Sequence, residues 1–299
     1  LDNISQWRRT ICGDLTEVFS PFDGSKVNQV PFLKRDPFVE TIFNAKFKEE
    51  PSGYQQLSAK DTDAIVQNPV GAALLPGQEE GIRSSCALPY ELYADSYIDT
   101  AKKEISFQLK SGDIFFGNDA AGSPFTVYAP GKFTDAAGVT ENARNWSFAV
   151  SPGDSLIYAW PIDAFEEKQY HLRLYGPNGF YRECMGNDED PRLQIQCLYE
   201  TGGRNHKPTG NIVLDMSNSD PSKPSHIEVT DNAYGKNRIR KTIIGSANEK
   251  LILNLKSSYG WYDFSVRVAG FDQFEKRFAG RVETGKESFT DPFMGRVKN

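Results

Sequence analysis

Alternation of apolar and polar side chains dominates the chain from about residue 86 onward. The apolar positions recur at every second residue in short runs, at 88–92, 105–109, 125–128, 146–150, 156–160 and 170–174. Turn-forming residues bound these runs, and Gly176-Pro177-Asn178-Gly179 is interpreted as a tight reversal between two strands. Short alternating runs with no long helical pattern between them predict an antiparallel β-sandwich.

A second series with similar spacing begins at about residue 189. Its runs lie at 193–197, 212–216, 227–229, 239–244, 251–255 and 262–268. The two series align run by run, for example 105–109 with 212–216 and 170–174 with 262–266. Unrelated sandwiches also look alike under such patterning. We expect a mostly-β fold of two tandem antiparallel β-sandwich domains, at 86–188 and at 189–299, the second with a C-terminal tail.

Residues 1–85 lack this alternation. Proline and glycine interrupt the apolar runs, and between them only 38–47 predicts a short helix, besides one or two helical turns at 7–11 and 15–19. So many helix-breaking residues leave no room for an independent core. We therefore expect an irregular, partly helical segment that lies along another domain.

The composition agrees with a β-rich chain and narrows the class of partner. Twenty Phe, 13 Tyr and 4 Trp stand beside only 3 Met in the 299 residues. Thirty-four Lys and Arg against 40 Asp and Glu give a formal charge of −6, so no basic field would attract nucleic acid. The sequence contains no run of about 18 uncharged apolar residues, so it predicts no membrane-spanning helix.

The four cysteines, Cys12, Cys86, Cys184 and Cys197, are far apart in the sequence and form no Cys-x-x-Cys pair. Their spacing argues against a zinc site, and we expect four buried free thiols. A disulfide between Cys184 and Cys197 is the alternative, because sequence alone cannot choose among the pairings. The acidic run 188–190 lacks the spacing of a calcium-binding loop and is interpreted as a hydrated linker.

Enzyme motifs are missing from the sequence. There is no Gly-x-Ser-x-Gly nucleophile elbow and no His-Glu-x-x-His helix. Residues 280–286 have the spacing of a phosphate-binding loop, but Glu287 stands where Ser or Thr must ligate magnesium. His171, His206 and His226 fall in different predicted elements and are interpreted as structural or solvated. We therefore predict no catalytic, cofactor-binding or metal-binding residue.

Several stretches, taken together and in order, resemble one enzyme family. They are residues 4–16 (ISQWRRTICGDLT), 75–83 (LPGQEEGIR), 87–92 (ALPYEL), 170–180 (YHLRLYGPNGF), 277–280 (RFAG) and 285–292 (GKESFTDP). They resemble the end of the catalytic core and the tandem C-terminal β-domains of bacterial phosphocholine-preferring phospholipases C, which are alkaline-phosphatase-like phosphoesterases. Each stretch alone is a weak match, but the set follows the same order as in the family from one end of the chain to the other.

The resemblance implies that residues 1–85 are the tail of a phosphoesterase catalytic core plus a linker, with the core itself before Leu1. That core would hold a hydroxyl nucleophile and a metal site, and would cleave the phosphodiester on the glycerol side of a phospholipid headgroup. No such residue can be placed on this chain, so we expect the chain alone to be inactive and without a cofactor. Any divalent metal would belong to the missing core. The resemblance also implies a periplasmic or extracellular location.

On this interpretation the sandwiches pack on their own catalytic core and complete or cover it, or they contact phospholipid at a membrane surface. Arg144 and Trp146 form one candidate contact strip, and Lys236, Arg238 and Arg240 form another. Alternating basic residues on a strand edge also guard against aggregation. A free-standing lipid- or carbohydrate-binding β-module and a complete small enzyme are the alternatives.

Overall fold

The computed structural model describes residues 35–47, 49, 52–68, 81–204, 206–235 and 238–294. The described residues fall into a helical unit before residue 79 and a β unit after it, and each is considered by itself. The helical unit holds α2 (Arg35–Asn44), the 3-10 helix η2 (Ala45–Phe47) and α3 (Ala59–Gln67).

The helix expected at 38–47 is confirmed by α2 and η2, but α3 was not predicted. A capping box starts α3: the Asp61 backbone N–H donates to the Ser58 hydroxyl, and the Ser58 backbone N–H donates to the Asp61 carboxylate. These bonds satisfy two groups that a helix start otherwise leaves unpaired. Ser58 and Asp61 are therefore the sequence signal that was missed. The turns expected at 7–11 and 15–19 lie outside the described residues.

The β unit contains two successive sets of seven main strands. The first set is β2 (Leu92–Asp99), β3 (Glu104–Ser111), β4 (Ser123–Tyr128), β7 (Asn145–Val150), β8 (Ser155–Pro161), β9 (Tyr170–Tyr175) and β10 (Tyr181–Gly186). The second set is β11 (Leu193–Gly202), β12 (Lys207–Asn218), β13 (Ser225–Asp231), β14 (Arg238–Ile243), β15 (Asn248–Leu253), β16 (Trp261–Val268) and β17 (Glu275–Arg281).

Short elements connect these strands. Two small sheets are formed by β5 (Lys132–Thr134) with β6 (Thr140–Asn142) and by β1 (Ser84–Ser85) with β18 (Ser288–Phe289). The 3-10 helices are η3 (Gly117–Asp119), η4 (Ile162–Ala164), η5 (Glu166–Lys168) and η6 (Lys256–Ser258). The β5–β6 hairpin lies between β4 and β7 and was not predicted.

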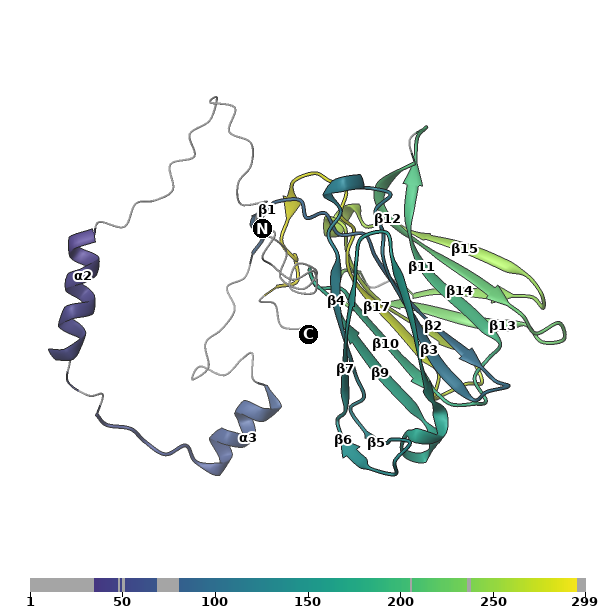
Figure 1. Ribbon diagram of the computed structural model, residues 1–299, viewed down its shortest axis with the longest axis horizontal. Coiled ribbons are helices and arrows are strands. Elements are labelled where there is room, and N and C mark those ends of the chain that lie inside the picture. Colours follow the sequence, from purple (N-terminus) through teal and green to yellow (C-terminus); the bar gives the residue numbers. More distant parts are fainter. Residues whose placement is uncertain are drawn as a thin grey trace. The chain divides into compact units, whose positions relative to one another are not determined.

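Both sets follow the same topology. The first, second and fifth strands of each set form a three-stranded sheet, β2-β3-β8 and β11-β12-β15. The remaining strands of both sets share one eight-stranded sheet, in the order β14-β13-β16-β17-β10-β9-β4-β7. Figure 1 shows its strands β9, β10 and β17 side by side. The centre of this sheet is the antiparallel pair β10 and β17, which pairs Tyr181 with Ala279 and Met185 with Glu275. The two sandwiches thus share one continuous sheet.

The inward-facing residues form two hydrophobic clusters, one in each set of strands. The first includes Phe107, Phe125 and Trp160, and the second includes Leu214 and Phe264, all nearly inaccessible to solvent. Burial of such side chains stabilises the fold by about 1.5–3 kcal/mol each. The mostly-β fold class with antiparallel sheets is confirmed, whereas the domain boundaries stay a prediction.

One predicted strand start was wrong. The alternation at 88–92 predicted a strand there, but residues 86–91 form none and β2 begins at Leu92. Pro89 has no N–H to give to a ladder. Its carbonyl instead accepts from Ala121 (2.9 Å), and the Glu91 carbonyl accepts from Gly112 (2.6 Å). The carbonyl groups of Pro89 and Glu91 are therefore hydrogen-bonded to neighbouring loops and not to a strand.

Cys86, Cys184 and Cys197 are free thiols in the structure. The prediction of burial is confirmed for Cys184 and Cys197, where burial raises the pKa of each thiol to about 12. It was wrong for Cys86, which is exposed in the segment leading into the first sandwich, and Cys12 lies outside the described residues. Among the described helices, none has the length and apolar character needed to cross a bilayer.

Candidate functional site

Arg144 and Trp146 lie where the β5–β6 hairpin leads into β7. The Arg144 guanidinium pairs with Glu141 at 2.8 Å and with Asp135 at 3.5 Å. It also lies over the rings of Trp146 and Phe133, at 5.8 Å from each centroid. Two carboxylates therefore compete with any anionic partner for Arg144, while Trp146 stays half-buried beside it.

Arg238 and Arg240 lie on β14, at the opposite end of the eight-stranded sheet from β7. Both guanidinium groups pair with the Glu228 carboxylate on β13, at 3.4 and 2.9 Å. Exposed pairs of this kind contribute at most about 1 kcal/mol. The structure therefore does not bring the two predicted contact strips together. Lys236 lies outside the described residues, and a contact role for all five residues stays a prediction.

Sequence reasoning missed the contrast between the outer edges of the two sandwiches. Strands β7 and β8, which we call the open edge of the first sandwich, contain no charged residue. Ile157 on β8 is 65% exposed, and the exposed Tyr158 packs against Phe148 on β7 with ring centroids 5.2 Å apart. The corresponding strands β14 and β15 carry five charged side chains between them. An uncharged edge is the kind that another chain can extend.

The inner edges of the three-stranded sheets, β2 and β11, meet at a seam. No backbone ladder joins these two strands in the described part of the chain, and side chains connect them instead. The Asp95 carboxylate accepts from the Cys197 N–H at 3.1 Å, and the Tyr199 hydroxyl donates to the Leu92 carbonyl at 2.9 Å. These bonds join the three-stranded layers of the two sandwiches, whose other layers already share the continuous sheet.

Two buried cations lie beneath the seam, one on each central strand of the eight-stranded sheet. Arg182 on β10 donates to the Ala279 carbonyl at 3.0 Å and to the Tyr262 hydroxyl at 3.2 Å. Lys276 on β17 donates to the Ser96 carbonyl at 2.8 Å. Burial lowers the pKa of the Lys276 ammonium and raises the pKa of the Asp95 carboxyl, both by desolvation. Such groups stabilise a fold only while their partners stay in place.

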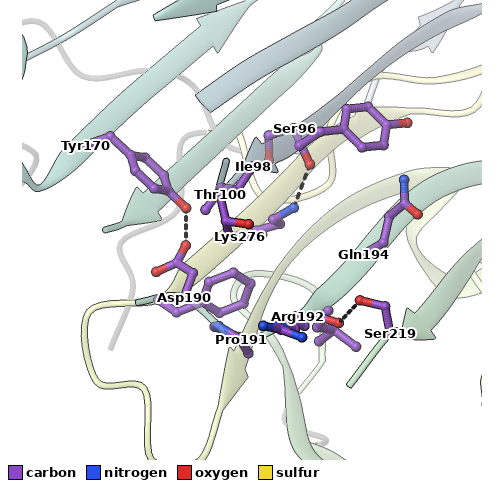
Figure 2. A pocket seen from close by; sticks show the side chains of 13 residues that line it. Ser96, Ile98, Thr100, Tyr170, Asp190, Pro191, Arg192, Gln194, Ser219 and Lys276 are labelled. Carbon is purple, nitrogen blue, oxygen red and sulfur yellow. Dashed lines mark hydrogen bonds between the residues drawn. The ribbon is translucent and has the colours of Figure 1, made fainter. Parts of the chain in front are cut away.

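A cavity of about 490 Å³ opens beside Lys276 (Figure 2). Its lining comes from β2, the start of β9, the linker between the sandwiches, β11 and β17. On one side the Tyr170 hydroxyl donates to the Asp190 carboxylate, whose other oxygen accepts from the Asn187 N–H at 2.9 Å. Burial raises the pKa of Asp190 to about 6, although these hydrogen bonds oppose the shift.

The acidic run 188–190 is split, because Asp190 lines the cavity whereas Asp188 and Glu189 are exposed. Within the described residues no group of three or more His, Cys, Asp or Glu side chains converges to hold a metal ion. His171 bonds to Glu183 at 2.7 Å and His226 bonds to Thr242 at 3.0 Å, which accounts for both side chains structurally. The described residues therefore do not fit a phosphoesterase metal centre.

The tight reversal at 176–179 binds the end of the second sandwich. Asn178, with a left-handed φ of 56°, donates its amide to the Glu283 carboxylate at 2.7 Å. Buried Glu283 also accepts from the Leu88 N–H at 3.3 Å and pairs with Arg281 at 3.5 Å. The residues with phosphate-loop spacing thus form a buried ion pair within the second sandwich, and the hydrogen bonds from Asn178 and Leu88 to Glu283 link it to the first.

Comparison with known proteins decides the family. The description "Bacterial phospholipase C, C-terminal domain" matches residues 84–187 and 193–281, which are the two sets of strands. The chain belongs to this family. The resemblance inferred from the sequence is thereby confirmed.

Three curated relatives are similar to nearly the whole chain. They are the non-hemolytic and hemolytic phospholipases C of Pseudomonas aeruginosa, 30% and 29% identical, and the non-hemolytic phospholipase C of Burkholderia pseudomallei, 31% identical. Each alignment covers 98% of this chain but only 38%, 39% and 37% of the respective relative. The chain therefore spans less than two-fifths of the length of these relatives.

One solved structure, the crystal structure of red sea bream transglutaminase, aligns with this chain. The alignment covers 79% of this chain and 34% of the transglutaminase chain. Its TM-score of 0.18 and sequence identity of 10% are too low to support an argument.

Proposed function

We propose that this chain is a non-catalytic region of a bacterial phospholipase C that hydrolyses phosphatidylcholine-type phosphodiesters. The family match and the three relatives support the link to phospholipase C. More than three-fifths of each relative lies outside the aligned region, which leaves room there for a phosphoesterase core and its metal. The observation that carries the non-catalytic role is that both matched stretches build one body, joined by a continuous sheet and a buried seam.

The two sandwiches are, in this proposal, copies of one ancestral domain. Both follow the same strand order, and the same family description covers both stretches. The copies then diverged at their outer edges, where the first now has no charged residue and the second has five.

The open edge of the first sandwich is the surface through which the region packs on the catalytic core. No described strand pairs with the outer side of β8, which therefore offers its backbone groups and the exposed side chains of Leu156, Ile157 and Tyr158 to a neighbouring strand. Contact with lipid through Trp146 and Tyr158 is the second candidate, because aromatic rings of this kind favour a membrane interface. Deep insertion would leave the backbone groups of β8 unsatisfied in hydrocarbon, which favours packing on protein.

The test compares the chain with the complete phospholipase C that contains it, using a chromogenic phosphocholine ester with and without divalent metal ions. The complete enzyme turns the ester over, and the purified chain does not under either condition. Turnover by the chain that a mock purification lacks would overturn the non-catalytic role. We also propose a periplasmic or extracellular location, on the family resemblance, and cell fractionation with an antibody against the chain tests it.

A further inference from the structure

We propose that the cavity beside Lys276 binds a small molecule carrying a phosphate group, with Lys276 and Arg192 as its cationic contacts. This inference goes beyond the function proposed above and does not depend on catalysis. It rests on an under-bonded buried cation, a second cation at the mouth and a cavity of suitable size (Figure 2).

Lys276 is the strongest element of the site. The residue is only 6% exposed, yet its ammonium group makes one hydrogen bond within the described residues, to the Ser96 carbonyl at 2.8 Å. An ammonium carries three N–H donors, and a buried polar group without acceptors costs free energy. Lys276 forms no ion pair within 4.0 Å among the described residues, although the charges of Asp95 and Asp190 attract it from farther away and its Nζ lies 5.9 Å from the Phe274 ring centroid. An anion in the cavity would supply the missing hydrogen-bond acceptors.

Arg192 supplies a second cation at the mouth of the same cavity. Its side chain is exposed and forms no ion pair with any described residue, while both the backbone N–H and the hydroxyl of Ser219 donate to its carbonyl, at 2.9 and 3.1 Å. The backbone that carries the guanidinium is thereby fixed beside the opening. A guanidinium binds phosphate through paired N–H donors, and an ammonium binds it as a point charge.

The size and lining of the cavity suit a small organic phosphate. A volume of about 490 Å³ lies within the usual range for ligand sites, roughly 300–1,000 Å³. Thr100 and Gln194 add a hydroxyl and an amide at the rim, and Ile98 and Phe274 supply apolar wall for the remainder of the molecule.

Asp190 makes the site sensitive to pH. Its carboxylate lines the same cavity and, when ionised, repels an anion. Burial and the neighbouring Asp188 charge raise the pKa of Asp190 to about 6, against the hydrogen bond from Tyr170 and the charge of Lys276. The other charged or ionisable groups acting on Lys276 are Asp95 on β2 and the Cys184 thiol on β10. Asp95 also has a raised pKa, because burial disfavours its charge. Anion binding should therefore strengthen as the pH falls from 7 to 5.

The experiment is calorimetric titration of the complete chain with inorganic phosphate and with glycerophosphocholine, at constant ionic strength. Saturable binding with a 1:1 stoichiometry is expected for at least one probe. Binding of inorganic phosphate assigns the site to free phosphate or monoesters, and binding of glycerophosphocholine alone assigns it to lipid headgroups. Binding of neither probe at millimolar concentration would overturn the proposal.

Variants locate the binding. R192Q should weaken affinity about tenfold or more, whereas R238Q, an exposed arginine on β14, should leave it unchanged. Equal weakening by both variants would show nonspecific charge attraction and contradict the site. D190N should tighten binding and remove most of its pH dependence, measured with sulfate because sulfate keeps its charge between pH 5 and 7. In K276M, provided it folds, phosphate should no longer raise the melting temperature; a variant that does not fold leaves R192Q and D190N to decide.

Discussion

At the scale of single residues, many charged groups of this region are held in specific pairs. Glu183 on β10 is an example: it accepts from His171 at 2.7 Å and from Arg173 at 2.8 Å on the neighbouring strand β9. Burial alone raises the pKa of Glu183, but the hydrogen bonds from His171, Arg173 and Tyr181 outweigh it and lower the pKa to about 2. These partners therefore favour the ionised carboxylate in the folded state.

The lowered pKa of Glu183 predicts a loss of stability in acid. The stabilisation is complete above the unfolded value of about 4.5 and disappears as the pH falls toward 2, because protonation then favours unfolding. Urea unfolding between pH 2.5 and 7 should show a shallower pH dependence for E183Q than for the wild type. The exposed E189Q serves as the control and should follow the wild-type curve; an E183Q curve parallel to the wild type would contradict the assignment.

Asn178 gives a second prediction at this scale. N178G keeps the freedom to adopt positive φ but removes the amide that binds buried Glu283. Loss of one donor to a buried carboxylate should lower the free energy of unfolding by about 1–2 kcal/mol in chemical denaturation. S246G, at an exposed residue with φ of 58°, is the matched control. It should lower the free energy of unfolding by only a few tenths of the change that N178G causes. If both variants behave alike, the hydrogen bond contributes nothing.

At the scale of elements, the sequence predicted most strands because period-two alternation is a local property. The strands over 105–109, 170–174 and 262–268 were found in this way. Helix α3 was missed because its signal is a two-residue cap. The strand expected at 88–92 was wrong because Pro89 and Glu91 bind loops. Alternation cannot tell an edge strand from an interior one, so the exposure of β8 was invisible.

The open edge of the first sandwich yields a prediction with an internal control. Ile157 on β8 and Ile252 on β15 occupy corresponding edge strands and are 65% and 54% exposed. In the complete enzyme, I157K places a charge in the contact with the catalytic core. It should therefore lower the melting temperature, or lower the turnover of the phosphocholine ester several-fold. I252K should alter neither. Equal effects of the two changes, or none from I157K, would contradict docking through this edge.

At the scale of the whole molecule, the two sandwiches act as one body because they share a sheet and close it with side-chain bonds. The pairing of β10 with β17 joins strands about 95 residues apart, and the local alternation of either strand does not reveal it. The cavity residues Tyr170, Asp190 and Lys276 likewise come from three separate segments. Sequence reasoning predicted none of them as site residues, since only the folded topology brings them together.

Differential scanning calorimetry of the complete chain at neutral pH tests the union of the sandwiches most directly. The β unit should unfold in a single cooperative transition, with a calorimetric enthalpy equal to the van't Hoff enthalpy. Two separable transitions, each with the enthalpy of about a hundred residues, would mean that the sandwiches are independent domains, and the shared sheet and seam would not carry the coupling assigned to them here.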